Sequence, residues 1–287
     1  MPLEKLVQYS SSYSSKPCNE YSFKELAEIY NETRIDYIVP MPMNTRRMME
    51  YVRDYDVHLG ASFIALNERN EVSGIGMLGF RDERAWITRL GVIPHRRGRG
   101  LGQFLMDTMI DKAREYCAKM IQLEVIEGNE PAHQLFLKTG FKENRTLSVI
   151  RRPPGAKLPE LFAGVNVQCI APEDISLYLA RRCETTSWVD ENTSMMNGGL
   201  LEGMEITMPS GERAWGIFRS LPFQMSHLVT GDHSLEAITQ LLIAIHMKYE
   251  TKDTKIENLE TGSSKWSAFE RVGYLEDFRR IEMTLSL

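Results

Sequence analysis

The sequence of 287 residues predicts an α/β (α+β) fold: a mixed, mostly antiparallel twisted sheet flanked by helices, duplicated along the chain. Segments of helical and strand periodicity alternate through the first half in the order α, α, three strands, helix, strand, helix, strand. A proline-rich stretch over residues 153–159 then interrupts regular structure. Beyond it, features of the first half return 133 residues later, as in the pairs Glu124 and Glu257, Phe136 and Phe269, and Gly140 and Gly273.

The elements of the first half each have a local signal. Ser22 and Glu25 have the spacing of a capping box, so a helix begins there, and a second helix begins near Thr45. Residues 37–43 between them carry two prolines and either line a pocket or cover the core. The remaining elements are a three-stranded antiparallel meander over 62–92, a helix over 101–120, a strand over 121–126, a short helix over 129–138 and a closing strand through Ile150.

The segment with the strongest functional signal is Arg97-Gly98-Arg99-Gly100-Leu101-Gly102, which we call the glycine loop. It follows the strand-like run 86–92 and opens an amphipathic helix. Glycines let a ligand approach the backbone, and the first turn of a helix offers unpaired N–H groups and the positive end of the helix dipole. Because the arginines add positive charge, the segment predicts a diphosphate site. The alternative is a basic turn that joins a strand to a helix and binds nothing.

A dinucleotide-binding pattern also occurs, at Gly74-Ile75-Gly76-Met77-Leu78-Gly79. That motif functions between a strand and a helix, but here a polar turn precedes it and another follows it. We therefore expect it in the middle of the meander, where its glycines mark a bulge or a surface against which another element packs closely.

The linker and the repeat divide the chain into two units, residues 1–152 and 160–287, joined by residues 153–159. Applied to the glycine loop, the same offset leads to Thr230-Gly231-Asp232-His233-Ser234-Leu235. This segment has lost two glycines and all of the arginines, and its Asp232 repels a diphosphate. Only the first copy is therefore expected to keep the phosphate site.

Composition limits the function classes. Hydrophobic residues make up 43% of the chain, but no apolar run reaches membrane-spanning length and no secretory signal is present, so we expect a cytoplasmic protein that engages no membrane. A formal net charge of −5 disfavours nucleic-acid binding. The four cysteines lack the spacing of a zinc ribbon, so we expect buried or idle thiols and no metal.

Two signature regions stand in the order and spacing of a known family. The first is Leu90-Gly91-Val92-Ile93-Pro94-His95-Arg96-Arg97-Gly98-Arg99-Gly100-Leu101-Gly102, and the second runs from Leu123-Glu124-Val125 through Asn129, Ala132 and Leu135-Phe136 to Gly140-Phe141. With these regions, residues 3–152 resemble the GCN5-related N-acetyltransferase (GNAT) superfamily. The whole chain resembles a tandem GNAT protein with a degenerate second copy.

The resemblance implies acetyl-CoA, or a related acyl-CoA, as co-substrate. It implies that the glycine loop binds the diphosphate, that the strand ending at Val92 splays from the strand at Ile121, and that pantetheine pairs with the exposed strand edge. Backbone amides near residues 90–92 then face the thioester carbonyl. The implied cofactor-binding residues are Leu90, Gly91, Val92, Arg97, Gly98, Arg99, Gly100, Leu101, Gly102, Asn129 and Phe136.

Glu124 is the implied catalytic residue, because the glutamate of the Leu-Glu-Val motif acts as a general base in some family members. A base is needed because only a neutral amine attacks a thioester. The alternative is a structural glutamate held by hydrogen bonds on the sheet. Asp82 and Glu83, in the turn before the cofactor strand, are less favoured candidates for the base.

Phe136 departs from the family pattern, which has a tyrosine at this position to protonate the departing thiolate. A phenyl ring has no proton to donate. The acid is therefore absent, supplied by water, or moved to another residue such as Tyr30 or Tyr37.

The leading hypothesis is an N-acetyltransferase that acts on a primary amine of a small molecule or peptide. The alternative is an acyl-CoA-binding sensor or scaffold without turnover, which Phe136 motivates. Four carboxylates either give the site an acidic mouth suited to a cation or are ordinary solvated surface groups: Asp36, Glu50, Asp54 and Glu83.

Overall fold

Twelve strands form one continuous sheet in the computed structural model, which describes residues 13–287. The strand order is β1-β2-β3-β4-β5-β12-β6-β11-β10-β9-β8-β7. Neighbouring strands are antiparallel except in two pairs, β4 with β5 and β10 with β11. The mixed, mostly antiparallel sheet with flanking helices is therefore confirmed. The start of the predicted first unit, residues 1–12, lies outside the described residues.

The first half of the chain contains the elements that the sequence predicts. They are β1 (Tyr13–Pro17), α1 (Phe23–Glu32), α2 (Thr45–Asp54), β2 (Phe63–Asn67), β3 (Val72–Arg81), β4 (Arg84–Val92), α3 (Leu101–Glu115), β5 (Met120–Ile126), α4 (Glu130–Lys138) and β6 (Lys142–Arg152). The capping box is present, because the Ser22 hydroxyl accepts from the Glu25 amide and the Glu25 carboxylate accepts from the Ser22 amide. Helix α3 is shorter than predicted.

The second half repeats this order after a linker without helix or strand over residues 153–165. Its elements are β7 (Asn166–Ile170), α5 (Ile175–Leu179), α6 (Asn192–Gly198), β8 (Leu201–Thr207), β9 (Arg213–Ser220), β10 (Gln224–Thr230), α7 (Leu235–Lys248), β11 (Asp253–Glu260), α8 (Trp266–Arg271) and β12 (Leu275–Ser286). The division of the chain at residues 152 and 160 stays a prediction, because the sheet runs without a break from one half to the other.

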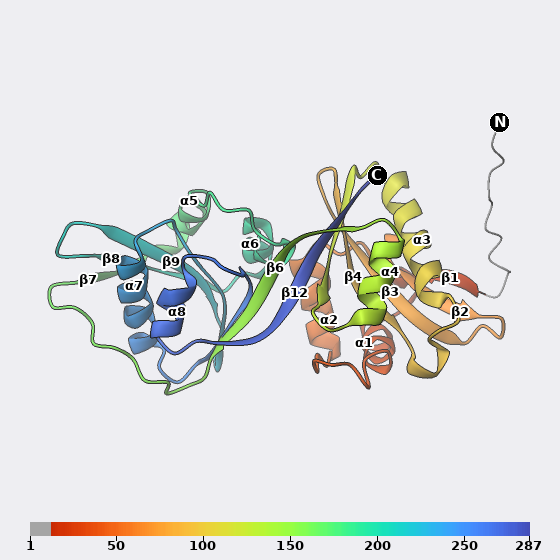
Figure 1. The fold of residues 1–287 in the computed structure, drawn as a ribbon, viewed down its shortest axis with the longest axis horizontal. Helices are drawn as coiled ribbons and strands as arrows, with labels where there is room; N and C mark the ends of the chain where they lie inside the picture. Colours follow the sequence, from red (N-terminus) through yellow and green to blue (C-terminus); the bar gives the residue numbers. More distant parts are fainter. Residues whose placement is uncertain (1–12) are drawn as a thin grey trace.

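Strands β6 and β12 join the two lobes by exchanging places (Figure 1). The last strand of the chain, β12, pairs antiparallel with β5 of the first half, whereas β6 pairs with β11 of the second half. The two exchanged strands also pair with each other along most of their length. Each lobe therefore contains a strand from the other half of the sequence.

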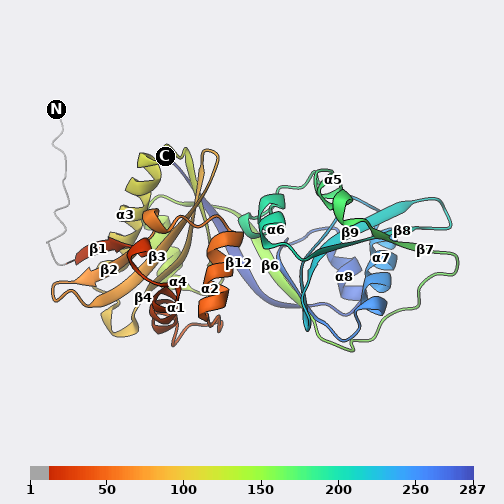
Figure 2. The same cartoon turned by 180° about the vertical axis from the view of Figure 1, so that it is seen from behind.

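Helices cover both faces of the sheet. In the first lobe, α3 and α4 pack on one face, and α1 and α2 on the opposite face (Figures 1 and 2). Successive residues of β2 show the alternation, because Phe63 and Ala65 belong to the α3 core and Ile64 to the α1 core. In the second lobe, α7 and α8 cover one face and α5 and α6 the other.

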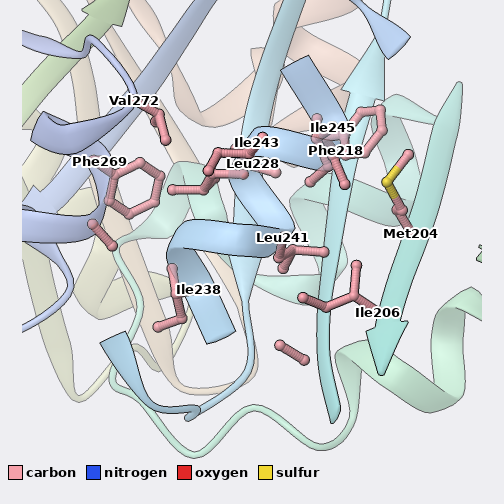
Figure 3. Packing of buried hydrophobic residues seen from close by; sticks show 14 of the residues in the cluster. Met204, Ile206, Phe218, Leu228, Ile238, Leu241, Ile243, Ile245, Phe269 and Val272 are labelled. Atoms are coloured by element: carbon pink, nitrogen blue, oxygen red, sulfur yellow. The ribbon is translucent and has the colours of Figure 1, made fainter. Parts of the chain in front are cut away.

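Helix α7 is the central element of the second lobe. Its apolar side chains, among them Ile238, Leu241 and Ile245, are buried against the sheet and against Phe269 of α8 (Figure 3). A helix that is apolar on nearly all sides requires cover on nearly all sides, which β8, β9 and α8 provide. The second copy thus keeps a complete core, although its glycine loop is degraded.

The glycine pattern at residues 74–79 lies within β3, as predicted. A Cβ atom on Gly74 would lie 2.7 Å from the carbonyl oxygen of Gly91 and one on Gly76 would lie 2.8 Å from Met109 of α3. These glycines allow α3 and β4 to approach the strand closely, and they form no nucleotide loop.

Candidate functional site

Strands β4 and β5 diverge soon after they begin. They pair in parallel only where residues 84–86 face residues 120–122, yet β4 continues to Val92 and β5 to Ile126. A β-bulge between Thr88 and Gly91 shifts β4 against β3, and Arg89 within it has a positive φ of 52°. The predicted splay is therefore present, and the bulge lies where the family resemblance places the thioester carbonyl.

The glycine loop connects the diverging edge of β4 to α3. Gly98 and Gly100 have φ values of 75° and 84°, in the left-handed region that favours glycine. Gly100 is the N-cap of α3, and no side chain of the described residues caps this helix end. The first-turn amides are therefore left for another acceptor, which is the arrangement that a phosphate site requires.

Arg97, the first residue of the glycine loop, and its neighbour Arg96 are both paired with carboxylates. Arg97 donates to both oxygens of Asp36 at 2.8 Å, and Arg96 lies 2.7 Å from Glu71. Arg97 also donates through Nε to the carbonyl oxygen of Val92 at 3.0 Å. The loop thus carries less uncompensated charge than its sequence predicts, and Arg97 lies along the edge of β4.

A cavity of about 490 Å³ lies beside the diverging strands and is lined by both halves of the chain. The first half contributes the segment after α1, the end of α2, the bulged part of β4, and parts of β5 and α4. The second half contributes residues of the short 3-10 helix η5 (Trp188–Asp190) and of β9, β10, β11 and β12. Of the predicted site residues, those that line it are Leu90, Glu124, Asn129 and Phe136.

Glu124 lies on β5 and is buried in this cavity. Its Oε1 accepts from Asn258 Nδ2 at 3.0 Å, and its Oε2 lies 3.4 Å from Arg280 Nη1. Burial raises the pKa of Glu124 to about 7, although the Arg280 cation and the Asn258 hydrogen bond oppose that shift. A carboxyl group with this pKa exchanges a proton near neutral pH.

Glu257, the residue 133 positions after Glu124, lines the same cavity from β11. Its carboxylate lies 2.7 Å from Arg280 Nη2 and 3.1 Å from Lys255 Nζ. Burial opposes ionisation of this carboxyl, but Arg280 and Lys255 outweigh it and lower the pKa of Glu257 to about 2. The two related glutamates share Arg280, and they differ in protonation behaviour because Arg280 and Lys255 both stand closer to Glu257.

Phe136 on α4 lines the cavity beside two polar residues. Asn129 donates through Nδ2 to the Tyr37 hydroxyl at 3.2 Å, and the guanidinium of Arg34 stacks over the Tyr37 ring at 3.9 Å. Tyr37 therefore lines the same cavity as Phe136, the residue that replaces the tyrosine of the family pattern. Tyr30, the other tyrosine considered, is buried in the α1 core and is not a lining residue.

The four carboxylates considered for an acidic mouth do not line the cavity, so the alternative of an acidic site is wrong. Asp36 pairs with Arg97, Glu50 with Arg46, Asp54 with Arg53 and Arg219, and Glu83 with Lys119. Glu83 and its neighbour Asp82 are exposed in the β3–β4 turn, so neither contacts the cavity as a base. Of the four cysteines, which were expected to be buried or idle, Cys18 is buried and Cys117, Cys169 and Cys183 are exposed free thiols.

Several lining residues escaped the sequence analysis. Arg89, Tyr51 and Arg280 belong to no motif, and Arg280 reaches the site only because β12 pairs with β5. The offset that relates Glu124 to Glu257 was a usable signal for the second carboxylate. Nothing in the sequence indicates that both side chains converge on one cavity.

Strands β10 and β11 of the second half diverge in the same way. They pair only over residues 224–226 and 253–255, and a bulge follows at His227, which has a φ of 51°. A cavity of about 330 Å³ lies in this second divergence. The Lys265 ammonium extends into it, donating to the Thr230 carbonyl oxygen at 3.3 Å and pairing with Glu184 at 2.8 Å.

The segment between β10 and α7 differs from the glycine loop in length as well as composition. Residues 231–234 connect strand to helix here, whereas residues 93–100 do so in the first half. The constant offset is therefore wrong within this segment. Ser234 caps α7 at the Ala237 amide, and both the amide and the hydroxyl of Ser234 donate to Glu212. The carboxylate of Glu212 therefore already occupies the N-terminal end of α7, where the first half leaves the end of α3 open.

Comparison with known proteins agrees with this geometry. Residues 23–141 match the sequence model of the Acetyltransferase (GNAT) family. The streptothricin acetyltransferase of Streptomyces lavendulae is 32% identical over 82 residues, which are 28% of this chain and 43% of that protein. A protein named probable N-acetyltransferase HLS1-like, from Arabidopsis thaliana, is 29% identical over 139 residues, which are 46% of this chain and 34% of that protein. The chain thus spans less than half the length of these curated relatives.

Solved structures show the fold of the whole chain. A GCN5-related N-acetyltransferase from Sphaerobacter thermophilus matches with a TM-score of 0.71 and 16% identity, covering 96% of each chain. A tandem GNAT protein from the clavulanic acid biosynthesis pathway matches with a TM-score of 0.64 and 13% identity, covering 96% of this chain and 98% of that one. Within residues 13–287, no helix is long and apolar enough to cross a membrane. Residues 23–141 thus match the acetyltransferase (GNAT) family model, and the chain as a whole has the fold of a tandem GNAT protein.

Proposed function

We propose that this protein transfers an acetyl group from acetyl-CoA to a primary amine of a small molecule or peptide, in the cavity between its two lobes. The observation that carries the proposal is that the free edge of β4 connects the open N-terminal end of α3 to the cavity that contains Glu124. A diverging strand edge leads from an uncapped, glycine-rich helix end to a cavity that contains a buried carboxyl with a pKa of about 7.

The residues of the first half fit the shape and charge of an acyl-CoA. The glycine loop offers α3 amides to the diphosphate, and a Cβ on Gly98 or Gly100 would meet no atom within 4 Å, so the space in front of the loop is open. The edge of β4 beyond Trp86 is free of β5 and is suited to pairing with the amides of pantetheine. Asn129 lines the cavity at the end of this path.

Glu124 is proposed as the general base. Acetyl-CoA supplies a thioester carbonyl, and the amine must lose a proton to attack it. Because the pKa of Glu124 is raised to about 7, its carboxylate is a stronger base than an ordinary glutamate and is still ionised in a useful fraction at neutral pH. Asn258 orients the carboxylate through its hydrogen bond to Oε1.

Tyr37 is proposed as the acid that returns a proton to the departing thiolate. Its hydroxyl contacts Asn129 and lies in the cavity that Phe136 also lines. The Arg34 guanidinium stacks over the ring and holds the Tyr37 side chain at the cavity wall. We expect Tyr37→Phe to lower kcat about tenfold or more while KM for acetyl-CoA changes little, as is typical when general-acid catalysis is lost.

The direct test is release of thiol from acetyl-CoA with a panel of polyamines, aminoglycosides, amino acids and peptides. For an active acceptor, the rate of the wild-type protein should rise with pH through about 7, because Glu124 acts in its ionised form. Glu124→Gln should lower kcat about a hundredfold, remove this rise and leave CoA affinity unchanged. An identical pH profile in Glu124→Gln would exclude Glu124 as the base.

Phe136 favours a second candidate, an acyl-CoA sensor without turnover, because the usual acid is missing from α4. Both functions predict that calorimetry detects CoA binding. Binding without turnover on every acceptor would favour the sensor, and the absence of CoA binding would exclude both.

A further inference from the structure

The cavity between the lobes is strongly basic. Six cationic side chains line it against two carboxylates, Glu124 and Glu257; the cations are Arg34, Arg47, Arg89, Arg219, Lys255 and Arg280. A site that served only an uncharged amine would not require this excess of positive charge, and a polycationic acceptor would be repelled by it.

Three of these cations are compensated within the protein. Arg280 and Lys255 pair with Glu257, and Arg219 lies 2.8 Å from Asp54. The other three, Arg34, Arg47 and Arg89, come from the first half, and across residues 13–287 no carboxylate lies within 4.0 Å of their nitrogen atoms. We call these three the arginine cluster.

Arg89 is the best defined member of the cluster. Its guanidinium lies 4.0 Å from the centre of the Tyr51 ring and 5.1 Å from that of Tyr30, and Nη1 donates to the Tyr30 hydroxyl at 3.0 Å. These contacts hold the plane of the guanidinium. The opposite edge, formed by Nε and Nη2, makes no hydrogen bond with any described residue, although Nε is buried.

A guanidinium that is held in one plane and has an unpartnered Nη2 is suited to donating to an oxyanion, and the unpartnered Nε beside Nη2 favours an anion there further. Leaving a buried cation without a counter-charge is costly, so an anionic ligand at this edge is favoured over water or a neutral group. We infer that the amine acceptor carries a carboxylate or phosphate group, which Arg89 binds while Arg34 and Arg47 add positive charge at the cavity wall. This inference rests on the proposed acetyltransferase function, since it places the anion beside the cavity that contains Glu124.

Calorimetric titration of inorganic phosphate and of acetate tests the cluster directly. The full chain is first saturated with CoA, so that the glycine loop is not available to the added anion. We expect the wild-type protein to bind at least one of these anions, and Arg89→Met to weaken that binding about ten- to a hundredfold. Arg89→Lys, which keeps the charge without the planar guanidinium, should have an intermediate effect. Arg46→Met is the matched control, because Arg46 is an exposed neighbour of Arg47 that does not line the cavity.

Turnover of matched amines shows whether the acceptor carries a carboxylate or a phosphate group. Thiol release is compared for β-alanine against propylamine and for phosphoethanolamine against ethanolamine, so that each pair differs mainly in the anionic group. The preferred anion should raise kcat/KM, and Arg89→Met should remove most of that preference while its CoA affinity matches the wild type.

The titration decides the inference even where these small amines are not acetylated. Equal phosphate and acetate affinity in the wild-type protein and Arg89→Met, or no binding of either anion by the wild type, would overturn it. Failure of CoA itself to bind would instead count against the proposed function.

Discussion

The two diverging strand pairs of this protein have the same backbone geometry, but the helix N-termini that follow them differ. Both β4–β5 and β10–β11 separate after three paired residues, and a bulge with a positive φ follows in each, at Arg89 and His227. The first divergence leads to an uncapped helix with glycines before it, and the second to a helix capped by Ser234 and Glu212. The splay is thus a property of the fold, whereas a few loop residues decide whether the helix end is capped or left open for the proposed diphosphate.

The two related glutamates make the same comparison inside one cavity. Glu124 and Glu257 stand 133 residues apart on equivalent strands and share Arg280. Their pKa values are displaced in opposite directions, to about 7 and about 2. Opposite displacement of two neighbouring carboxyls is how a protein assigns them different tasks, and it agrees with the proposal that Glu124 transfers a proton while Glu257 compensates charge.

Removal of the shared cation should have the largest effect on this comparison. Arg280→Met leaves the partly buried Glu257 with Lys255 as its remaining counter-charge, and we expect the free energy of unfolding at pH 7 to fall by about 2 to 4 kcal/mol. Chemical denaturation measures it. Arg279→Met is the matched control, because Arg279 forms only a surface pair with Glu276 and should change stability by less than about 1 kcal/mol. Equal losses in both variants would show that Arg280 is not the common partner.

Opposite pH dependence of the two glutamates is the next test. Because the folded-state pKa of Glu257 is lowered, its stabilisation is present above its ordinary pKa and is lost as pH falls toward about 2. The raised pKa of Glu124 has the reverse effect, and the wild-type protein loses stability as pH rises from about 4.5 through about 7.

Gln substitutions separate the two contributions. Glu257→Gln should lower stability at pH 8 by about 3 kcal/mol at most, whereas Glu124→Gln should gain stability relative to the wild type between pH 5 and pH 8. Thermal or urea unfolding at these two pH values checks both. The same sign of change in the two variants would contradict the assignment.

Substitution in the two loops compares the helix ends themselves. Gly100→Trp places a bulky residue at a φ of 84° in front of the α3 amides, so we expect CoA affinity to fall about a hundredfold. Asp232→Trp makes the matched change at an exposed position before α7 and should leave CoA affinity unchanged. Calorimetry with CoA measures both affinities. Full CoA affinity in Gly100→Trp would show that the diphosphate does not bind at the glycine loop.

The smallest expected effect concerns the cap of α7. Ser234→Ala removes the hydroxyl that accepts from the Ala237 amide and donates to Glu212, and we expect a loss of about 1 kcal/mol in stability. CoA affinity should not change, because this helix end belongs to the second lobe. A loss of CoA affinity in this variant would show that the second copy takes part in cofactor binding.

Much of the local structure could be predicted because it depends on neighbouring residues. The capping box at Ser22, the meander through Val92 and the glycine pattern within β3 follow from short-range spacing, and each is present. The glycine loop was likewise identified from the order of strand, glycines and helix. Glu124 was identified through the family motif, and its role as base stays a prediction.

The cavity could not be predicted from the sequence. Its lining combines Arg89, held by Tyr30 and Tyr51, with Arg280 and Glu257 from more than 160 positions later in the chain. Local periodicity does not specify which strand pairs with which over such separations. The exchange of β6 and β12 decides it, because only this pairing brings Arg280 between the two glutamates.

The sequence alone therefore determined the elements, the duplication and the glycine loop that we propose binds a diphosphate, since these depend on residue type and short spacing. Tertiary structure decided the charge of the acceptor cavity and the pKa of each glutamate. The physical reason is that a pKa depends on burial and on the distance to other charges, and both are set by packing between segments distant in the chain.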